Sequence, residues 1–201
     1  MASSVPREPN PSPAVPFPVV ALVTAASELD GLAAVVRVLA ALPLGLPAAL
    51  VVAKHIQAGD AERVVHLLGR HTDLTVRAAS HPDKLSAGVV LVAPSAGQLL
   101  VTGDGRVGIV RTHAGRPQPP AADLLLITLA NSCGPRALAV LMTGQAPDPL
   151  AGLRAIDHHG GTVFAHDTVR TTRTARTLVQ RWLPLADIAP AIVGWARDHQ
   201  P

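Results

Sequence analysis

Short, unbroken apolar runs recur along this chain, and segments with helical periodicity separate most of them. Such runs are typical of strands in a parallel sheet that is covered on both faces, because no strand position meets water. The predicted strands are residues 19–23, 48–53, 74–77, 89–93, 138–142 and 162–165. The predicted helices are residues 28–42, 61–70, 123–132, 150–158, 174–181 and 186–196. This order predicts a doubly wound α/β fold, with a mostly parallel sheet and helices on both faces.

Two further apolar stretches flank a glycine turn and predict an antiparallel β-hairpin added to that sheet. Residues 98–102 and 106–111 lie on either side of Gly103-Asp104-Gly105. A glycine-containing turn between two such runs is a hairpin signal. The same turn is too short to be a dinucleotide-binding fingerprint, and it sits inside the hairpin.

The composition indicates one domain behind a short tail. The chain has 201 residues and is 48% hydrophobic, which suits a single core. Residues 1–16 are rich in proline and serine, so we expect a disordered tail there and a domain over residues 17–201. The leucine-rich stretch at residues 32–53 is broken by Arg37, Pro43 and two other residues, which argues against membrane insertion. The single Cys133 excludes an internal disulfide and fits a cytoplasmic protein.

The charge is mildly basic, with 17 Lys and Arg against 14 Asp and Glu. Several arginines gather late in the chain, at Arg170, Arg173, Arg176 and Arg181. They form either a solvated helix face or a positive stripe for an acidic partner. The chain has two Phe, two Trp and no Tyr, so it offers few aromatic rings for stacking on bases, and we expect no nucleic-acid partner.

Three loops should carry the chemistry, because ligands of an open parallel sheet collect at the carboxyl ends of its strands. These loops follow the strands that end near Val23, Ala53 and Met142. Together with other segments they resemble the CheB-type family, the protein-glutamate methylesterases of bacterial chemotaxis. The segments that carry the resemblance are residues 51–55, 88–94, 123–125, 134–137, 152–156, 160–161 and 183–190.

The resemblance implies a Ser/His/Asp hydrolase that removes methyl groups from glutamyl methyl esters on chemoreceptors and releases methanol. It implies no cofactor. The family histidine and aspartate fall on His55 and Asp148. The family serine falls on Ala25, whose methyl group cannot attack an ester. Full-length relatives carry a receiver domain ahead of the esterase domain, and in its place this chain has the proline-rich tail, so we expect no control by phosphorylation in cis.

The surrounding loop residues also depart from the family pattern. Ser27 and Glu28 replace two glycines, which places Cβ atoms where backbone N–H groups should approach an oxyanion. In the third loop Gln145 replaces a methionine, and Ala146 and Pro149 replace glycines. The usual Arg-Pro-Ser before Asp123 is Pro119-Pro120-Ala121, so a substrate-side arginine has no counterpart other than Arg116.

Ser27 and Asp148 each fit a second role. Ser27 could be a displaced nucleophile, but Ser27-Glu28-Leu29-Asp30 has the form of a capping box. Asp148 before Pro149 suits a helix N-cap, and a capping residue can also orient a histidine base. A late group of His158, His159, His166 and Asp167 matches no standard zinc spacing, so we expect no metal site.

Two functions remain open at this point. The first is a methylesterase-like domain with weak or no turnover, whose site would be His55, Asp148 and the displaced Ser27. The second is a catalytically silent domain that binds a signalling partner through the same fold. In either case the resemblance implies a methylated chemoreceptor or a related signalling protein as the partner.

Overall fold

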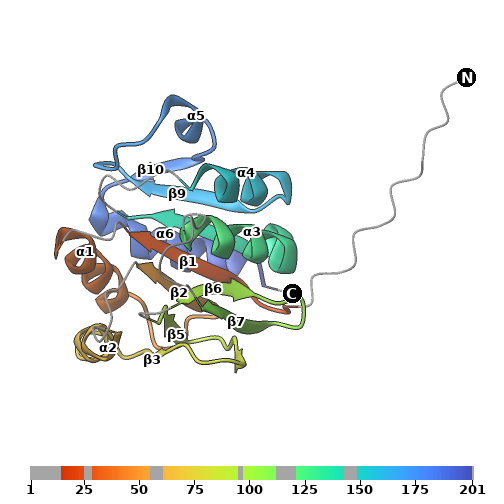
Figure 1. The fold of residues 1–201 in the computed structure, drawn as a ribbon. Helices are drawn as coiled ribbons and strands as arrows, with labels where there is room; N and C mark the ends of the chain where they lie inside the picture. Colours follow the sequence, from red (N-terminus) through yellow and green to blue (C-terminus); the bar gives the residue numbers. More distant parts are fainter. Residues whose placement is uncertain are drawn as a thin grey trace, which may run out of the picture.

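A seven-stranded parallel sheet forms the centre of the molecule, in the order β10-β9-β8-β1-β2-β5-β3 (Figure 1). The computed structural model describes residues 15–24, 29–54, 61–94, 97–111, 121–142 and 149–200. The strands of this sheet are β1 (Val19–Thr24), β2 (Ala49–Lys54), β3 (Thr75–Ala78), β5 (Val89–Val92), β8 (Ala137–Leu141), β9 (Thr162–His166) and β10 (Arg181–Leu183). Every pair of neighbours in it is parallel.

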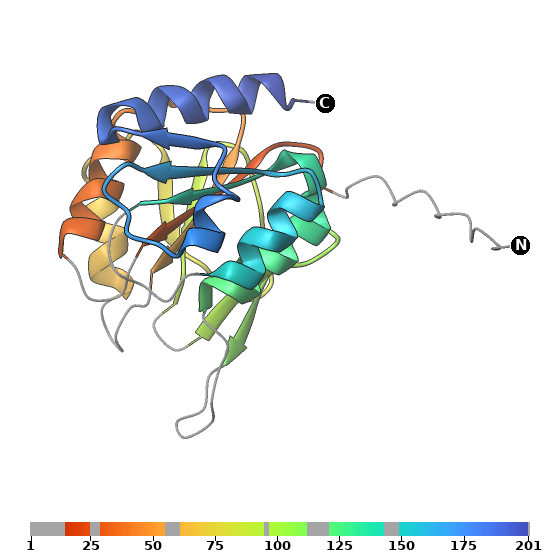
Figure 2. The same cartoon turned by 90° about the horizontal axis from the view of Figure 1, so that it is seen from above.

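Helices cover both faces of this sheet (Figure 2). One core joins the sheet to α1 (Leu29–Ala40), α2 (Ala61–Gly69) and α6 (Leu185–Asp198). The second core joins it to α3 (Ala121–Cys133), α4 (Leu150–His158) and the short α5 (Arg173–Arg176). The predicted doubly wound α/β class is therefore confirmed. In the described ranges, no helix is long and apolar enough to cross a membrane.

The central strand β1 supplies both cores. All six of its residues are buried. Successive side chains of a strand point to opposite faces, so Val20 and Leu22 pack with α1 and α6, while Val19, Ala21 and Val23 pack with α3 and α4. An apolar residue is needed at every position, which is why the sequence shows an unbroken run rather than an alternation.

The predicted hairpin is present, but it belongs to a second, antiparallel sheet of three strands. It consists of β6 (Gly97–Val101) and β7 (Arg106–Arg111), and β4 (Asp83–Lys84) pairs with the other edge of β7. The hairpin is fastened to α3, because the Thr128 hydroxyl accepts the Val101 N–H at 3.1 Å and the Ser132 hydroxyl donates to the Val101 carbonyl at 3.1 Å.

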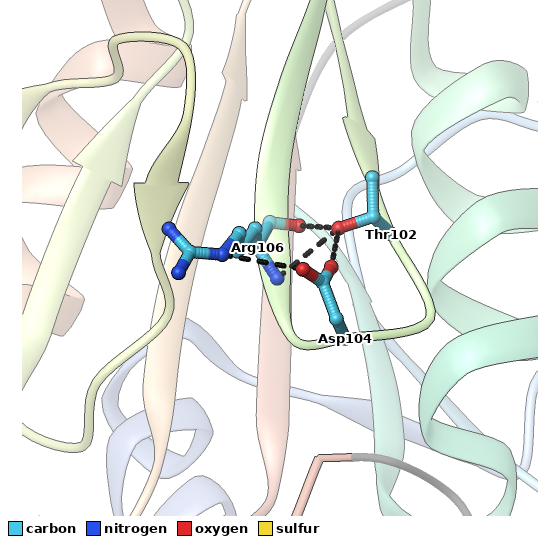
Figure 3. A network of polar contacts seen from close by, with 3 residues as sticks. All are labelled: Thr102, Asp104 and Arg106. Atoms are coloured by element: carbon cyan, nitrogen blue, oxygen red, sulfur yellow. Dashed lines mark hydrogen bonds and ion pairs between the residues drawn. The ribbon is translucent and has the colours of Figure 1, made fainter.

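A local polar network fixes the hairpin turn (Figure 3). The Thr102 hydroxyl donates to the Asp104 carboxylate and accepts the Arg106 N–H at 3.2 Å. Arg106 Nε lies 3.2 Å from Asp104 Oδ2. The Thr102 hydroxyl, and to a smaller extent the Arg106 charge, hold the pKa of Asp104 below its ordinary value. Gly105 has a φ of 77°, a conformation that side chains rarely adopt, so this turn has a structural use for its glycine.

One predicted helix is wrong. The helix predicted over residues 174–181 is the short α5, which ends at Arg176, and the chain then enters β10 at Arg181. Thr177 and Val179 are β-branched and lower helix propensity, while pairing with β9 stabilises the extended form of Arg181–Leu183. Of the expected tail, residues 1–14 lie outside the described residues, and Val15 is fully buried in the core beside α3.

Candidate functional site at the carboxyl edge of the sheet

Strands β8, β1 and β2 are neighbours, and they end at the same edge of the sheet. Thr24 pairs with Lys54 across β1 and β2, and Val23 pairs with Leu141 across β1 and β8. The chain leaves this edge three times, into residues 25–28, 55–60 and 143–148. The three loops that the sequence singles out therefore start from adjacent strand ends, as predicted for a site of this fold.

The predicted site residues themselves lie outside the described residues. This holds for Ser27, His55 and Asp148, for Ala25 at the serine position, and for Arg116. Their roles stay predictions. The structure describes the ends of the strands and helices from which these loops begin and to which they return.

The loop at residues 143–148 is anchored at its start by the backbone. Met142 is fully buried, and its N–H donates to the Val23 carbonyl of β1 at 2.9 Å. This bond extends the β1–β8 ladder by one residue beyond the strand. The loop thus begins at a fixed distance from the end of β1.

The far end of the same loop is anchored by Asp123. This buried residue lies in the first turn of α3, and its Oδ1 accepts the Gly152 N–H in the first turn of α4 at 2.8 Å. The first N–H groups of a helix have no partner within the helix, so a carboxylate here satisfies one of them and interacts favourably with the helix dipole. Asp123 therefore performs at a distance what a capping residue would perform locally.

The structure places the N-cap of α4 at Pro149, without a side-chain cap bond, one residue after the N-cap position predicted from the sequence; Asp148 itself lies outside the described residues. Proline has no N–H and occupies helix starts readily, which makes this shift possible at no cost in hydrogen bonds. The predicted start of the helix, at Leu150, is confirmed.

Gly152 allows α3 and α4 to approach closely enough for the Asp123 bond. A Cβ at this position would lie 2.6 Å from Leu126 Cβ, which is closer than real Cβ atoms come, and 3.3 Å from Asp123 Cα, which is a tight contact. In the sequence, both residues stand out only as part of the segments that resemble the family. The one physical signal for Asp123 is its place as an acidic residue in the first turn of an otherwise apolar helix.

A second polar group at this edge is Thr24, the last residue of β1. Its side chain is buried, and its Oγ1 has no hydrogen-bond partner in the described part of the chain. Buried hydroxyls are usually paired, because leaving one unpaired costs about 1–3 kcal/mol. The sequence predicts only that Thr24 ends a strand, and it gives no sign that the side chain is buried.

The late histidines do not gather into one site. His158 and His159 contact each other edge to face with ring centroids 5.3 Å apart. His166 lies at the end of β9, where its Nδ1 is 2.7 Å from Thr168 Oγ1 and its Nε2 is 3.3 Å from Asp167 Oδ1. Within the described ranges, His, Cys, Asp and Glu form no group of three or more that could hold a metal ion.

Cys133 is not a candidate nucleophile. It is fully buried at the end of α3, and burial raises the pKa of its thiol to about 12, although the nearby Arg136 charge acts in the opposite direction. A cysteine attacks as the thiolate, so a buried thiol of this kind is inert near neutral pH.

Comparison with known proteins gives one consistent result. The family model described as CheB methylesterase matches residues 23–192. The protein-glutamate methylesterase FrzG of Myxococcus xanthus is 35% identical over 196 residues, which cover 94% of this chain and 57% of that protein. A protein-glutamate methylesterase/protein-glutamine glutaminase of Moorella thermoacetica is 38% identical over 187 residues, 88% of this chain and 44% of that protein. The chain thus spans about half the length of these curated relatives.

The fold comparison agrees with the family comparison. The structure of the Thermotoga maritima CheB methylesterase catalytic domain superposes with a TM-score of 0.80 and 23% sequence identity. The match covers 90% of this chain and 99% of that domain. The sheet order and the helices on its two faces are therefore those of a known domain.

Proposed function

The chain belongs to the CheB methylesterase family, and we propose that it recognises glutamyl methyl esters on a signalling protein but hydrolyses them too slowly to exceed the uncatalysed background. The observation that carries the proposal is the juxtaposition of the carboxyl ends of β8, β1 and β2, which precede the positions of Asp148, Ala25 and His55. The partner class is a methylated chemoreceptor or a related cytoplasmic signalling protein.

Ester hydrolysis of this type needs a hydroxyl that attacks the carbonyl carbon while a histidine accepts its proton. The tetrahedral intermediate that forms expels methanol, which takes the proton from the histidine, and leaves an acyl-enzyme. Water then attacks the acyl-enzyme, which releases the free glutamate and restores the hydroxyl. The proposed alignment puts alanine at the position of that hydroxyl, so only slow, direct attack by water remains. Loss of a triad serine costs on the order of a million-fold in kcat, which is the size of the reduction that we propose.

The anchored loop ends support recognition despite the missing hydroxyl. Met142 and Asp123 fix both ends of the loop that contains Asp148, and neither contact depends on Ala25. A domain of this kind keeps the frame of an ester site while losing the nucleophile. The hypothesis of a displaced nucleophile, Ser27, remains as an outcome of the experiment below.

The test measures methanol release from methylated receptor peptides by the purified protein. We expect no release above the uncatalysed background from the natural chain, and measurable release from the triple variant Ala25→Ser, Ser27→Gly, Glu28→Gly. The natural chain should still bind methylated peptide more tightly than the same peptide with free glutamates.

Two results would contradict the proposal. Fast methanol release by the natural chain that disappears in Ser27→Ala would identify Ser27 as the nucleophile. Equal binding of methylated and unmethylated peptides, together with an inactive triple variant, would indicate a silent partner-binding domain without an ester site.

A further inference from the structure

The connection between β9 and α6 carries the net charge of the whole chain. This segment, residues 167–184, is called the arginine segment below. It contains Arg170, Arg173, Arg176 and Arg181 but a single acidic residue, Asp167, and so has a formal net charge of +3. The complete chain also has a net charge of +3. The formal charges of all other residues therefore sum to zero.

The arginine segment forms the outer end of the large sheet. It contains α5 and β10, and β10 is the edge strand next to β9 (Figure 1). All four arginines are exposed. In the described part of the chain, none of them forms an ion pair with a carboxylate, and the one acidic residue of the segment contacts His166 instead. The positive charges are thus available to a partner.

Two of the four guanidinium groups are held in place by aromatic rings. Arg176 of α5 lies 4.5 Å from the ring centre of Trp182, and Arg181 lies 5.3 Å from that of Phe164 on the neighbouring strand. Such cation–π contacts restrict the side chain but leave the N–H groups at the rim of the guanidinium free to donate. Side chains that are already ordered lose less entropy when a partner binds.

The two rings lie on opposite faces of the sheet. Phe164 belongs to the core under α1 and α6, whereas Trp182 packs against the core under α3 and α4. Arg181 and Arg176 therefore flank β10 from its two sides. The arginine segment presents its charge around the edge of the sheet rather than along one helix face, which argues against the simpler interpretation of a solvated helix.

We propose that the arginine segment is a docking surface for an acidic segment of a protein partner, bound by pairing of guanidinium groups with Glu and Asp carboxylates. Arginine suits this role because its planar fork of N–H donors matches a carboxylate with two parallel hydrogen bonds. Two strands, β9 and β8, separate β10 from β1, so the proposal does not depend on whether the domain hydrolyses esters.

Nucleic acid and membrane fit this surface less well. All four Phe and Trp residues of the chain are described. Phe164 and Trp195 are buried, and the ring of Trp182 is covered by Arg176. Phe17 is half-buried against the core and lies outside the arginine segment. Stacking of bases on exposed rings is therefore not available here. Among the described residues, the large hydrophobic side chains that are exposed are Leu44, Leu67 and Val110, and none lies in the arginine segment to insert into a bilayer.

The test is binding of a fluorescently labelled, glutamate-rich peptide, measured by fluorescence anisotropy over a series of salt concentrations. The variant is the double substitution Arg170→Gln, Arg173→Gln, which leaves both cation–π contacts in place. The matched control is Arg37→Gln, Arg197→Gln, which removes the same charge from exposed positions on α1 and α6. Thermal unfolding of each variant checks that the fold is retained.

We expect the natural chain to bind the peptide with an affinity that falls as salt rises. The segment variant should bind about fivefold to tenfold more weakly, and the control variant less than about twofold more weakly. Equal losses in both variants, or no loss in either, would overturn the proposal, because binding would then reflect net charge alone. Absence of peptide binding, or tighter binding of single-stranded DNA of equal charge or of anionic vesicles, would overturn it as well.

Discussion

The centre and the end of the large sheet use different side chains. Strands β8, β1 and β2 contain no charged residue before Lys54, and they bury aliphatic side chains on both faces. The end, formed by the arginine segment with α5 and β10, combines a three-residue strand with four exposed arginines. The centre therefore derives its stability from packing, whereas the end is free to change its surface charge without loss of the fold.

Replacement of a central side chain should produce the largest effect. Leu22 of β1 is fully buried, and Leu22→Ala should lower the free energy of unfolding by about 2–5 kcal/mol, because it removes contacts and leaves a cavity. Leu178→Ala, at a half-buried position after α5, should cost much less. Urea unfolding measures both changes. Equal losses of unfolding free energy in the two variants would contradict the distinction between the centre and the end of the sheet.

Loss of the Asp123 hydrogen bond should have the second largest effect on stability. Asp123→Ala should lower the free energy of unfolding by about 1–3 kcal/mol, since it leaves the buried Gly152 N–H without an acceptor. Asp123→Asn keeps an oxygen that can accept this bond and should retain most of the stability. If the alanine and asparagine variants are equally destabilised, the negative charge rather than the hydrogen bond holds α4.

Cys133 gives the centre a dependence on alkaline pH. Its pKa is raised to about 12 in the folded state, so the unfolded chain loses the thiol proton at lower pH than the folded chain. The stabilisation is complete below the unfolded pKa and is lost as pH rises toward 12, by about 1 kcal/mol per pH unit. Unfolding curves from pH 8 to pH 10 should therefore show about 1 kcal/mol more loss in the natural chain than in Cys133→Ala. Parallel losses in the two proteins would contradict this assignment.

The smallest effect is expected at the sheet end. Arg176→Gln removes the charge above Trp182 and should cost about 0.5–1 kcal/mol of stability. The Trp182 fluorescence should shift at the same time, because the ring loses its cover. A loss of stability as large as that of Leu22→Ala would contradict this expectation, because the arginine segment would then stabilise the fold and not only set its surface charge.

The sequence predicts the centre of the sheet well because the central strands need an apolar residue at every position. Such unbroken apolar runs can be recognised from the sequence alone. It misses β10, since Arg181–Leu183 is too short to show a period, and pairing with β9 decides its conformation. It also misses β4, which has two residues and exists because β7 lies beside it.

The candidate site also has one part that the sequence predicts and another that it does not. The order of the strands predicts which loops share the carboxyl edge, and this part is confirmed by the register of β8, β1 and β2. The bond between Asp123 and Gly152 joins residues 29 positions apart and depends on how closely two helices pack, which no local pattern records. The assignments of Ala25, Ser27, His55 and Asp148 came from resemblance to the family, and they stay predictions.

The position of β1 also has a consequence for the timing of internal motions. It has a strand on each side and helices on both faces, so its amide hydrogens reach water only when the whole domain opens. β10 has one neighbouring strand and can open by local fraying. The first loop of the candidate site is therefore attached to the part of the molecule that opens last. A partner could join and leave the arginine segment many times in the interval between two openings of the sheet centre.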